Sequence, residues 1–225
     1  MAPDAGISPT PDYPVNLNLS GRRCLVVGGG TVAERKAEAL LAAGAEVTVV
    51  SPELTAQLAS WAEQGKLRHL AREFRSGDAA GYRLVLCATD SMGVNEQAAQ
   101  EARASGALVN VADTPALCDF TLPARLQRGS LSIAVSTGGQ SPALARELRN
   151  ELARRIGPEY AEYLEIVGRL RREWRESCDS SAERCRRWDE LKGFDPEILE
   201  LLRQGRREEA EVRFRHGIGC PGTQP

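Results

Sequence analysis

The chain has 225 residues, of which 42% are hydrophobic and 27% are charged, and its formal net charge is −2. A chain of this length can bury a hydrophobic core without disulfide bonds or structural metals, and the composition is typical of soluble globular proteins. No apolar run is long enough to span a membrane, and the first residues lack the basic and apolar segments of a signal peptide. The near-neutral net charge argues against binding to nucleic acid. We therefore expect neither membrane nor nucleic acid as a partner.

The cysteines, histidines and lysines exclude several kinds of site. Six cysteines occur without a C-x-x-C pair, which does not suggest a disulfide framework in a chain without an export signal. Cys24 and Cys87 lie in apolar runs and are predicted core residues. With only two histidines and three lysines, histidine triads, zinc sites and Schiff-base lysines have few candidates. We expect a reduced, cytoplasmic protein with no metal site.

Strands and helices alternate over the first two thirds of the chain. The predicted strands are residues 23–27, 46–50, 67–70, 83–88, 108–111 and 131–135. The predicted helices are residues 31–43, a helix opened by Ser51-Pro52-Glu53, residues 92–105 capped by Thr89-Asp90, and residues 142–156. This alternation predicts an α/β fold, a Rossmann-type parallel sheet with helices on both faces.

The pattern changes after Gly157-Pro158, and half of the charged residues lie in the last third of the chain. Amphipathic helices are predicted over residues 159–177 and 181–192, with one or two more in 195–215. The expected anchors of this smaller helical region are Trp174, Trp188 and Phe194, and His216 is expected in a tail.

The sharpest motif is VVGGGTVAERK, residues 26–36, in which Gly28, Gly30 and Ala33 fit the G-x-G-x-x-G/A dinucleotide fingerprint. The first glycine permits a tight turn, the second lets a pyrophosphate approach the backbone, and the alanine lets helix and strand pack closely. The motif follows a strand and opens a helix, as a dinucleotide site requires. The alternative is a tight strand–helix turn without a ligand.

The residues after the second strand bear on the choice of cofactor. Ser51 stands where such sites usually carry an acidic residue, and Pro52 and Glu53 follow it. A 2′-phosphate would require a cation, and residues 51–65 contain neither arginine nor lysine. We therefore predict NAD rather than NADP.

A carboxylate follows the fifth strand in VNVADTPALCDF, residues 109–120. Asp113 lies where ligand-facing residues occur in this architecture, and its carboxylate can take a proton or orient a cationic group. The alternative is a turn former, because Asp-Thr-Pro is favourable turn chemistry.

A polar loop and a helix follow the last predicted strand in VSTGGQSPALARELR, residues 135–149. The N–H groups of such a loop can bind carboxylates or phosphates, and arginines on the next helix can assist. The alternative is an ordinary helix cap with solvated arginines. The candidate substrate-binding residues are Ser136, Thr137, Gly138, Arg146 and Arg149.

Together with LCATD at residues 86–90, these motifs resemble the precorrin-2 dehydrogenase family, which includes the N-terminal part of siroheme synthases. The resemblance covers about residues 14–175. It implies NAD-dependent oxidation of precorrin-2 to sirohydrochlorin, and in some members metal insertion. It also implies a homodimer and an essential aspartate at Asp113, and it places a serine that is phosphorylated in some relatives at Thr137. The implied cofactor contacts are Gly28, Gly30, Thr31, Val32, Pro52 and Glu53, and Ser51 and Thr89 are further candidate contacts.

The resemblance also implies a division of the chain. The expected parts are a flexible N-terminus at 1–14, an NAD-binding domain at 15–112, a central dimerisation and substrate region at 113–157, a helical domain at 158–216 and a tail at 217–225.

Three alternative functions differ in the residues that they require. A Tyr/Lys-dependent short-chain dehydrogenase is excluded because no tyrosine has a lysine four residues later. An NAD-binding regulatory module would usually keep an acidic residue after the second strand and would not need the second and third motifs. A family member that acts only as a chelatase or scaffold is the remaining alternative.

Overall fold

The computed structural model describes residues 12–177 and 195–217. The chain divides between Leu122 and Pro123 into two compact units. No helix within the described ranges has the length and apolar character needed to cross a membrane.

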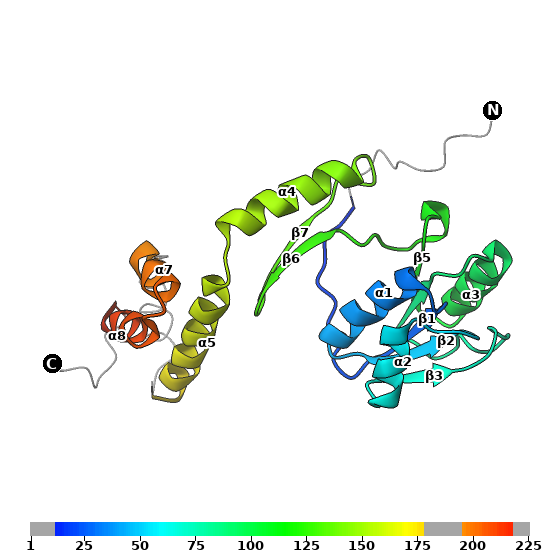
Figure 1. The fold of residues 1–225 in the computed structure, drawn as a ribbon, viewed down its shortest axis with the longest axis horizontal. Coiled ribbons are helices and arrows are strands. Elements are labelled where there is room, and N and C mark those ends of the chain that lie inside the picture. The colour runs from blue at the N-terminus through cyan, green and yellow to red at the C-terminus, as the bar shows by residue number, and fades with distance from the viewer. Residues whose placement is uncertain (1–11, 178–194, 218–225) are drawn as a thin grey trace. The chain divides into compact units, whose positions relative to one another are not determined.

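The first unit is a five-stranded parallel sheet flanked by helices (Figure 1). The strand order is β3-β2-β1-β4-β5, so the chain runs outward from β1 first to one side and then to the other. The elements are β1 Arg23–Val27, α1 Thr31–Ala42, β2 Glu46–Val50, α2 Ala56–Glu63, β3 Leu67–Leu70, β4 Leu84–Cys87, α3 Met92–Ala104, β5 Leu108–Val111 and the short 3-10 helix Pro115–Leu117. The predicted α/β fold with a Rossmann-type sheet is confirmed.

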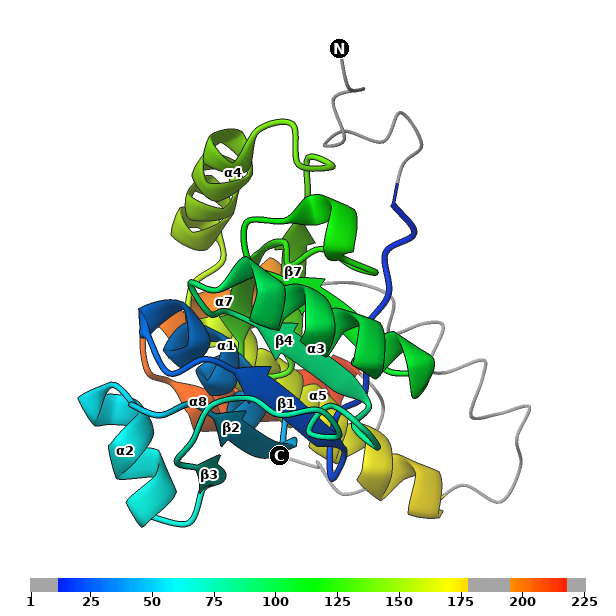
Figure 2. The same ribbon diagram turned by 90° about the vertical axis from the view of Figure 1, so that its right-hand side faces the viewer.

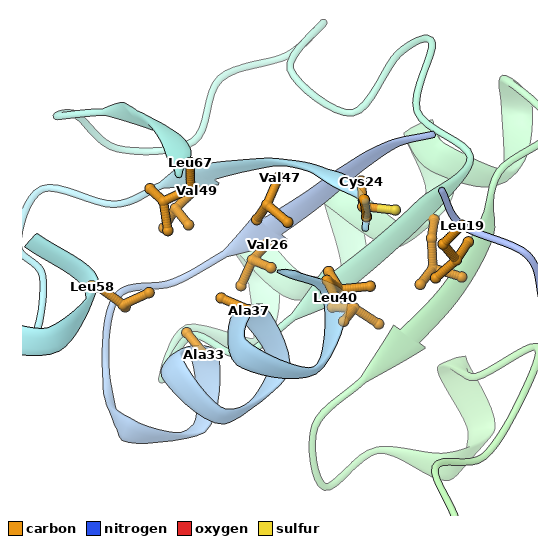
Figure 3. Packing of buried hydrophobic residues seen from close by; sticks show 13 residues of the cluster. Leu19, Cys24, Val26, Ala33, Ala37, Leu40, Val47, Val49, Leu58 and Leu67 are labelled. Atoms are coloured by element: carbon orange, nitrogen blue, oxygen red, sulfur yellow. The ribbon is translucent and has the colours of Figure 1, made fainter. Parts of the chain in front are cut away.

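The alternating side chains of β1 separate two hydrophobic clusters. Cys24 and Val26 point to one face, where α1 and α2 cover the sheet (Figure 3). Leu25 and Val27 belong to the cluster on the other face, to which α3 supplies three buried alanines, Ala98, Ala99 and Ala102. Figure 2 shows α3 beside β4. Both faces of a parallel sheet are therefore buried, which explains why the strands are nearly continuous apolar runs.

The second unit begins with an antiparallel hairpin and continues as helices. Its elements are β6 Ala124–Arg128, β7 Leu131–Val135, α4 Pro142–Arg155, α5 Glu159–Ser177, α7 Pro196–Arg203 and α8 Arg207–Gly217. Helix α4 packs on the hairpin, and α5, α7 and α8 share a separate core. In that core the rings of Tyr163 and Phe214 meet edge to face, with 5.5 Å between centroids.

Several predicted elements differ in the structure. Residues 131–135 do form a strand, but it pairs with β6 in the hairpin and not with the parallel sheet. The helix expected at Ser51 begins only at Ala56, because Thr55 is its N-cap and accepts the N–H of Leu58.

The cap of α3 and the position of His216 also differ from the prediction. Ser91, and not Thr89-Asp90, caps α3. His216 lies in the last turn of α8 and not in a tail. The side chains of Trp174, Trp188 and Phe194 and the helix expected at 181–192 lie outside the described residues. The described helical core depends instead on Ile166, Leu170, Ile198, Leu202, Ala210 and Phe214.

Candidate functional site

The candidate site lies at the carboxyl edge of the parallel sheet. The register aligns Val27 with Val50 and Cys87, and Cys87 with Val111, so four strands end at the same level. Strand order reverses between β1 and β4, and ligands of open α/β sheets bind in the crevice outside such a switch point. The predicted cofactor residues and Asp113 all lie in loops at this edge or in the first turn of α1.

Two of the three glycines after β1 are required by close packing. Gly28 has φ of 118°, and a Cβ there would collide with the carbonyl of Ala88 at the end of β4. A Cβ at Gly29 would collide with the carbonyl of Glu53 in the loop after β2. Residues 28–30, the glycine loop, therefore pack between the ends of β2 and β4. A side chain at Gly28 or Gly29 would displace this loop.

Gly30 differs, because a Cβ built there meets no atom within 4 Å and its φ is −82°. Neither packing nor backbone conformation requires a glycine at this position. Gly30 is also the N-cap of α1, and no side chain caps the free N–H groups of the first turn, which Thr31 and Val32 open. Open space beside unpaired N–H groups at a helix N-terminus is the environment that a pyrophosphate requires.

The loop after β2 is held against the glycine loop. The Thr55 N–H donates to the carbonyl of Gly29 at 3.0 Å, and its hydroxyl donates to the Glu34 carboxylate at 2.5 Å. Ser51 is buried, and its carbonyl oxygen lies 2.9 Å from Nε2 of His69. Pro52 and Glu53 lie in the exposed part of the loop.

The arginine that follows the end of β3 is engaged elsewhere. The guanidinium of Arg72 donates to both carboxylate oxygens of Asp78, at 2.6 and 2.7 Å. This pairing holds the pKa of the Asp78 carboxyl below its usual range.

The loop after β4 is fixed by a side-chain pair. The Thr89 hydroxyl donates to Oδ1 of Asn95 at 2.8 Å, and Nδ2 of Asn95 donates to the Thr89 carbonyl at 2.9 Å. Asn95 is buried in α3. Thr89 therefore holds the loop through Asn95 rather than capping the helix itself.

Asp113 lies in the turn after β5, and its φ of 55° makes it the one non-glycine residue in the left-handed region among those described. Its side chain is exposed, and the structure gives its carboxylate no hydrogen-bond or salt-bridge partner within the described ranges. A left-handed aspartate is uncommon and marks either a turn or a functional constraint. An exposed carboxylate at this edge remains available to a ligand.

Lys36 is a further residue at this edge, not predicted from the sequence, and its ammonium donates to Oδ1 of Asn110 in β5 at 2.6 Å. Burial lowers the pKa of this ammonium, whereas the nearby Asp113 carboxylate acts to raise it. One signal was present in the sequence. Lys36 follows Ala33 by three residues and precedes Leu40 by four, so it lies on the buried face of α1.

The candidate substrate residues lie in the second unit. The Ser136 hydroxyl accepts the Gly138 N–H at 3.2 Å, and the Thr137 hydroxyl accepts the Ser141 N–H at 3.1 Å. Both hydroxyls thus shape the loop before α4. On α4, Arg146 is exposed, while Nε of half-buried Arg149 has no hydrogen-bond partner among the described residues.

Known proteins resemble this chain in both sequence and structure. A model described as "Putative NAD(P)-binding" matches residues 15–124, and one described as "Sirohaem biosynthesis protein central" matches residues 128–155. Siroheme synthases of Nitrosococcus oceani and Methylococcus capsulatus are 41% and 40% identical over 88% and 89% of this chain. A solved structure of SirC, precorrin-2 dehydrogenase, superposes with a TM-score of 0.71 at 28% identity. The chain thus resembles precorrin-2 dehydrogenases and siroheme synthases over most of its length.

Coverage differs between these relatives. This chain spans 42% of the length of the two siroheme synthases, whereas the match with SirC covers 92% of this chain and 99% of the other. The resemblance inferred from the motifs is confirmed. The NAD(P)-binding model and the match with SirC support a nicotinamide cofactor.

Proposed function

We propose that this chain oxidises precorrin-2 to sirohydrochlorin with NAD as the electron acceptor. The observation that carries the proposal is the position of Asp113. Its exposed carboxylate follows β5 at the edge where Gly30 leaves open space beside the first turn of α1. The near-complete match with SirC, precorrin-2 dehydrogenase, supports the choice of substrate.

The reaction removes two electrons and two hydrogens from the substrate. The bound nicotinamide supplies the hydride acceptor, and a proton must leave separately. Asp113 is the candidate to accept that proton or to hold the substrate in position for hydride loss. The first-turn N–H groups of α1 and the open backbone at Gly30 orient the cofactor.

The second unit is proposed to bind the carboxylate rim of the tetrapyrrole. Arg146 and Arg149 on α4 are suited to this role because guanidinium groups bind carboxylates through paired hydrogen bonds. Arg128 is less suited, because its guanidinium already donates to the carbonyls of Ile156 and Ala153 near the end of α4. We also propose that the protein acts as a homodimer.

NAD is proposed in preference to NADP. The loop of residues 51–55 offers no cation to a 2′-phosphate, and Arg72 is held by both oxygens of Asp78. A ribose 2′-hydroxyl requires only a neutral partner, which Ser51 or the loop backbone provides.

An anaerobic assay tests the proposal. Purified protein is mixed with precorrin-2 and NAD, and the absorption spectrum of sirohydrochlorin is followed together with NADH formation. Equal amounts of both products support the dehydrogenase. Binding of NAD without turnover of precorrin-2 would contradict it and favour a regulatory module. A parallel reaction with sirohydrochlorin and ferrous iron, against an uncatalysed control, detects a chelatase.

A further inference from the structure

Lys36 is a cation on the helix face that packs against the sheet. It lies between Ala33 and Leu40, both buried, and its own side chain is partly buried. Burying an ammonium is costly unless hydrogen bonds and an opposite charge compensate. An aliphatic residue would fill this position without that cost, so the lysine calls for an explanation.

The hydrogen bond of Lys36 leads to the loop that carries Asp113. Asn110 accepts from the ammonium through Oδ1, and its Nδ2 donates to the carbonyl of Phe120 at 3.0 Å. The Val111 N–H donates to Sγ of Cys118 at 3.2 Å. Residues 118–120 therefore fold back along β5, and Asp113 lies in the turn between the strand and this returning segment.

A second pair of contacts closes the same loop. The Asp119 N–H donates to the carbonyl of Val109 at 2.8 Å, and the Asp119 carboxylate accepts the Val109 N–H at 2.9 Å. These bonds fix both ends of the turn, whereas the Asp113 carboxylate itself is left unpartnered within the described ranges. The turn is thus held from β5, the returning segment and helix α1.

The groups around the Lys36 ammonium include one carboxylate that can balance its positive charge. Burial lowers the pKa of this ammonium, Cys118, Cys87 and Asp113 act in the opposite direction, and Arg35 adds to the lowering. Burial raises the pKa of Cys87 to about 12, so that thiol is neutral at physiological pH. Asp113 is the one carboxylate in this set.

We infer that Lys36 is a positioning residue for Asp113. Its hydrogen bond to Asn110 fixes the loop that holds the carboxylate, and its positive charge attracts that carboxylate. This inference rests on the proposed dehydrogenase function for its kinetic consequence, but the coupling between the two side chains is independent of turnover.

Three substitutions separate the hydrogen bond from the charge. Lys36→Met removes both, Lys36→Gln keeps an amide donor without charge, and Lys36→Arg keeps the charge. Lys66→Met is the matched control, because Lys66 is an exposed lysine of the same unit. Circular dichroism and NAD titration first establish that each variant is folded and binds cofactor.

The kinetic test compares dehydrogenation by these variants. We expect Lys36→Met to lower kcat by about 10- to 100-fold, the size of effect that small misplacements of a reacting group produce, with NAD affinity unchanged. Lys36→Arg should recover most of the rate, and Lys66→Met should match the parent. A folded Lys36→Met variant with parental kcat would overturn the inference. Loss of NAD binding would also overturn it, because Lys36 would then be a cofactor contact.

A titration tests the coupling without any turnover. The chain has only three lysines, so selective labelling of lysine Cε gives a simple NMR spectrum, which Lys36→Met and Lys66→Met assign. We expect Asp113→Asn to lower the pKa of Lys36, because a charge that supports the ammonium is lost. An unchanged Lys36 titration would refute the coupling. If the parent protein failed to oxidise precorrin-2 but Asp113→Asn still lowered the pKa of Lys36, the proposed function would be wrong. The coupling between Lys36 and Asp113 would still hold.

Discussion

Gly30 offers a direct test of the cofactor site, because the structure assigns no packing role to its missing side chain. A Cβ at this position meets nothing within 4 Å, and the backbone has φ of −82° and ψ of −174°, which any residue adopts. Gly30→Val therefore adds its methyl groups to open space. The expected structural cost is limited to a poorer N-cap, about 1 kcal/mol.

The effect on NAD should be much larger. The valine side chain would occupy the space through which the pyrophosphate approaches the first turn of α1. Each charge-assisted hydrogen bond to a phosphate contributes about 1.5–3 kcal/mol, so losing two corresponds to about 3–6 kcal/mol. Since 1.4 kcal/mol is about tenfold in affinity, binding should weaken by about 10²- to 10⁴-fold.

Calorimetric titration with NAD and thermal unfolding by circular dichroism measure these two effects on the same samples. Gly93→Ala is the matched control, because a Cβ at Gly93 in α3 also meets nothing within 4 Å. It should leave NAD affinity unchanged and stabilise α3 by about 0.5–1 kcal/mol. Gly29→Ala should instead impair folding, because its Cβ collides with the carbonyl of Glu53. A folded Gly30→Val protein with parental NAD affinity would refute the placement of the cofactor.

Three other predictions address the remaining loops. Asp113→Asn should lower the dehydrogenation rate by about 10²- to 10⁴-fold without changing NAD affinity, and a near-parental rate would reduce Asp113 to a turn former. NAD should bind more tightly than NADP in competitive titrations, and the reverse would mean that a cation reaches the ribose from elsewhere. The Asp78 carboxylate, paired with Arg72, should stabilise the fold above pH about 4, and this contribution should be lost as the pH falls through its depressed pKa. Asp78→Asn should therefore make the free energy of unfolding, measured with urea, depend less on pH in the acid range.

The first strand–turn–helix unit could be predicted from sequence because its determinants are local. An apolar run, three glycines and a helical repeat follow one another within residues 23–43. The start of the next helix could not be predicted in the same way. Pro52 predicts a helix N-terminus near Ser51, but Thr55 is the N-cap of α2. The hydrogen bond from the Thr55 N–H to the Gly29 carbonyl holds residues 51–55 as a loop. That contact joins segments far apart in the chain.

The hairpin was missed for a related reason. Residues 124–128, ARLQR, contain two arginines and show only weak alternation, so they lack the appearance of a strand. The Gly129-Ser130 connection before residues 131–135 was nevertheless a two-residue hairpin signal. Lys36 was missed because a charge on a helix is usually assigned to the solvated face, although its spacing from Ala33 and Leu40 places it on the buried one.

The conformation of Asp113 connects these local and long-range effects. A left-handed backbone costs a residue with a side chain about 1–2 kcal/mol, although aspartate tolerates it better than most. Such a conformation persists when surrounding contacts determine it. Here Cys118 and Asp119 hold the returning segment to β5, and Asn110 ties it to Lys36 on α1. None of these bonds engages the carboxylate, so the network fixes the backbone of Asp113 and leaves its charged group exposed at the edge where the cofactor loop opens.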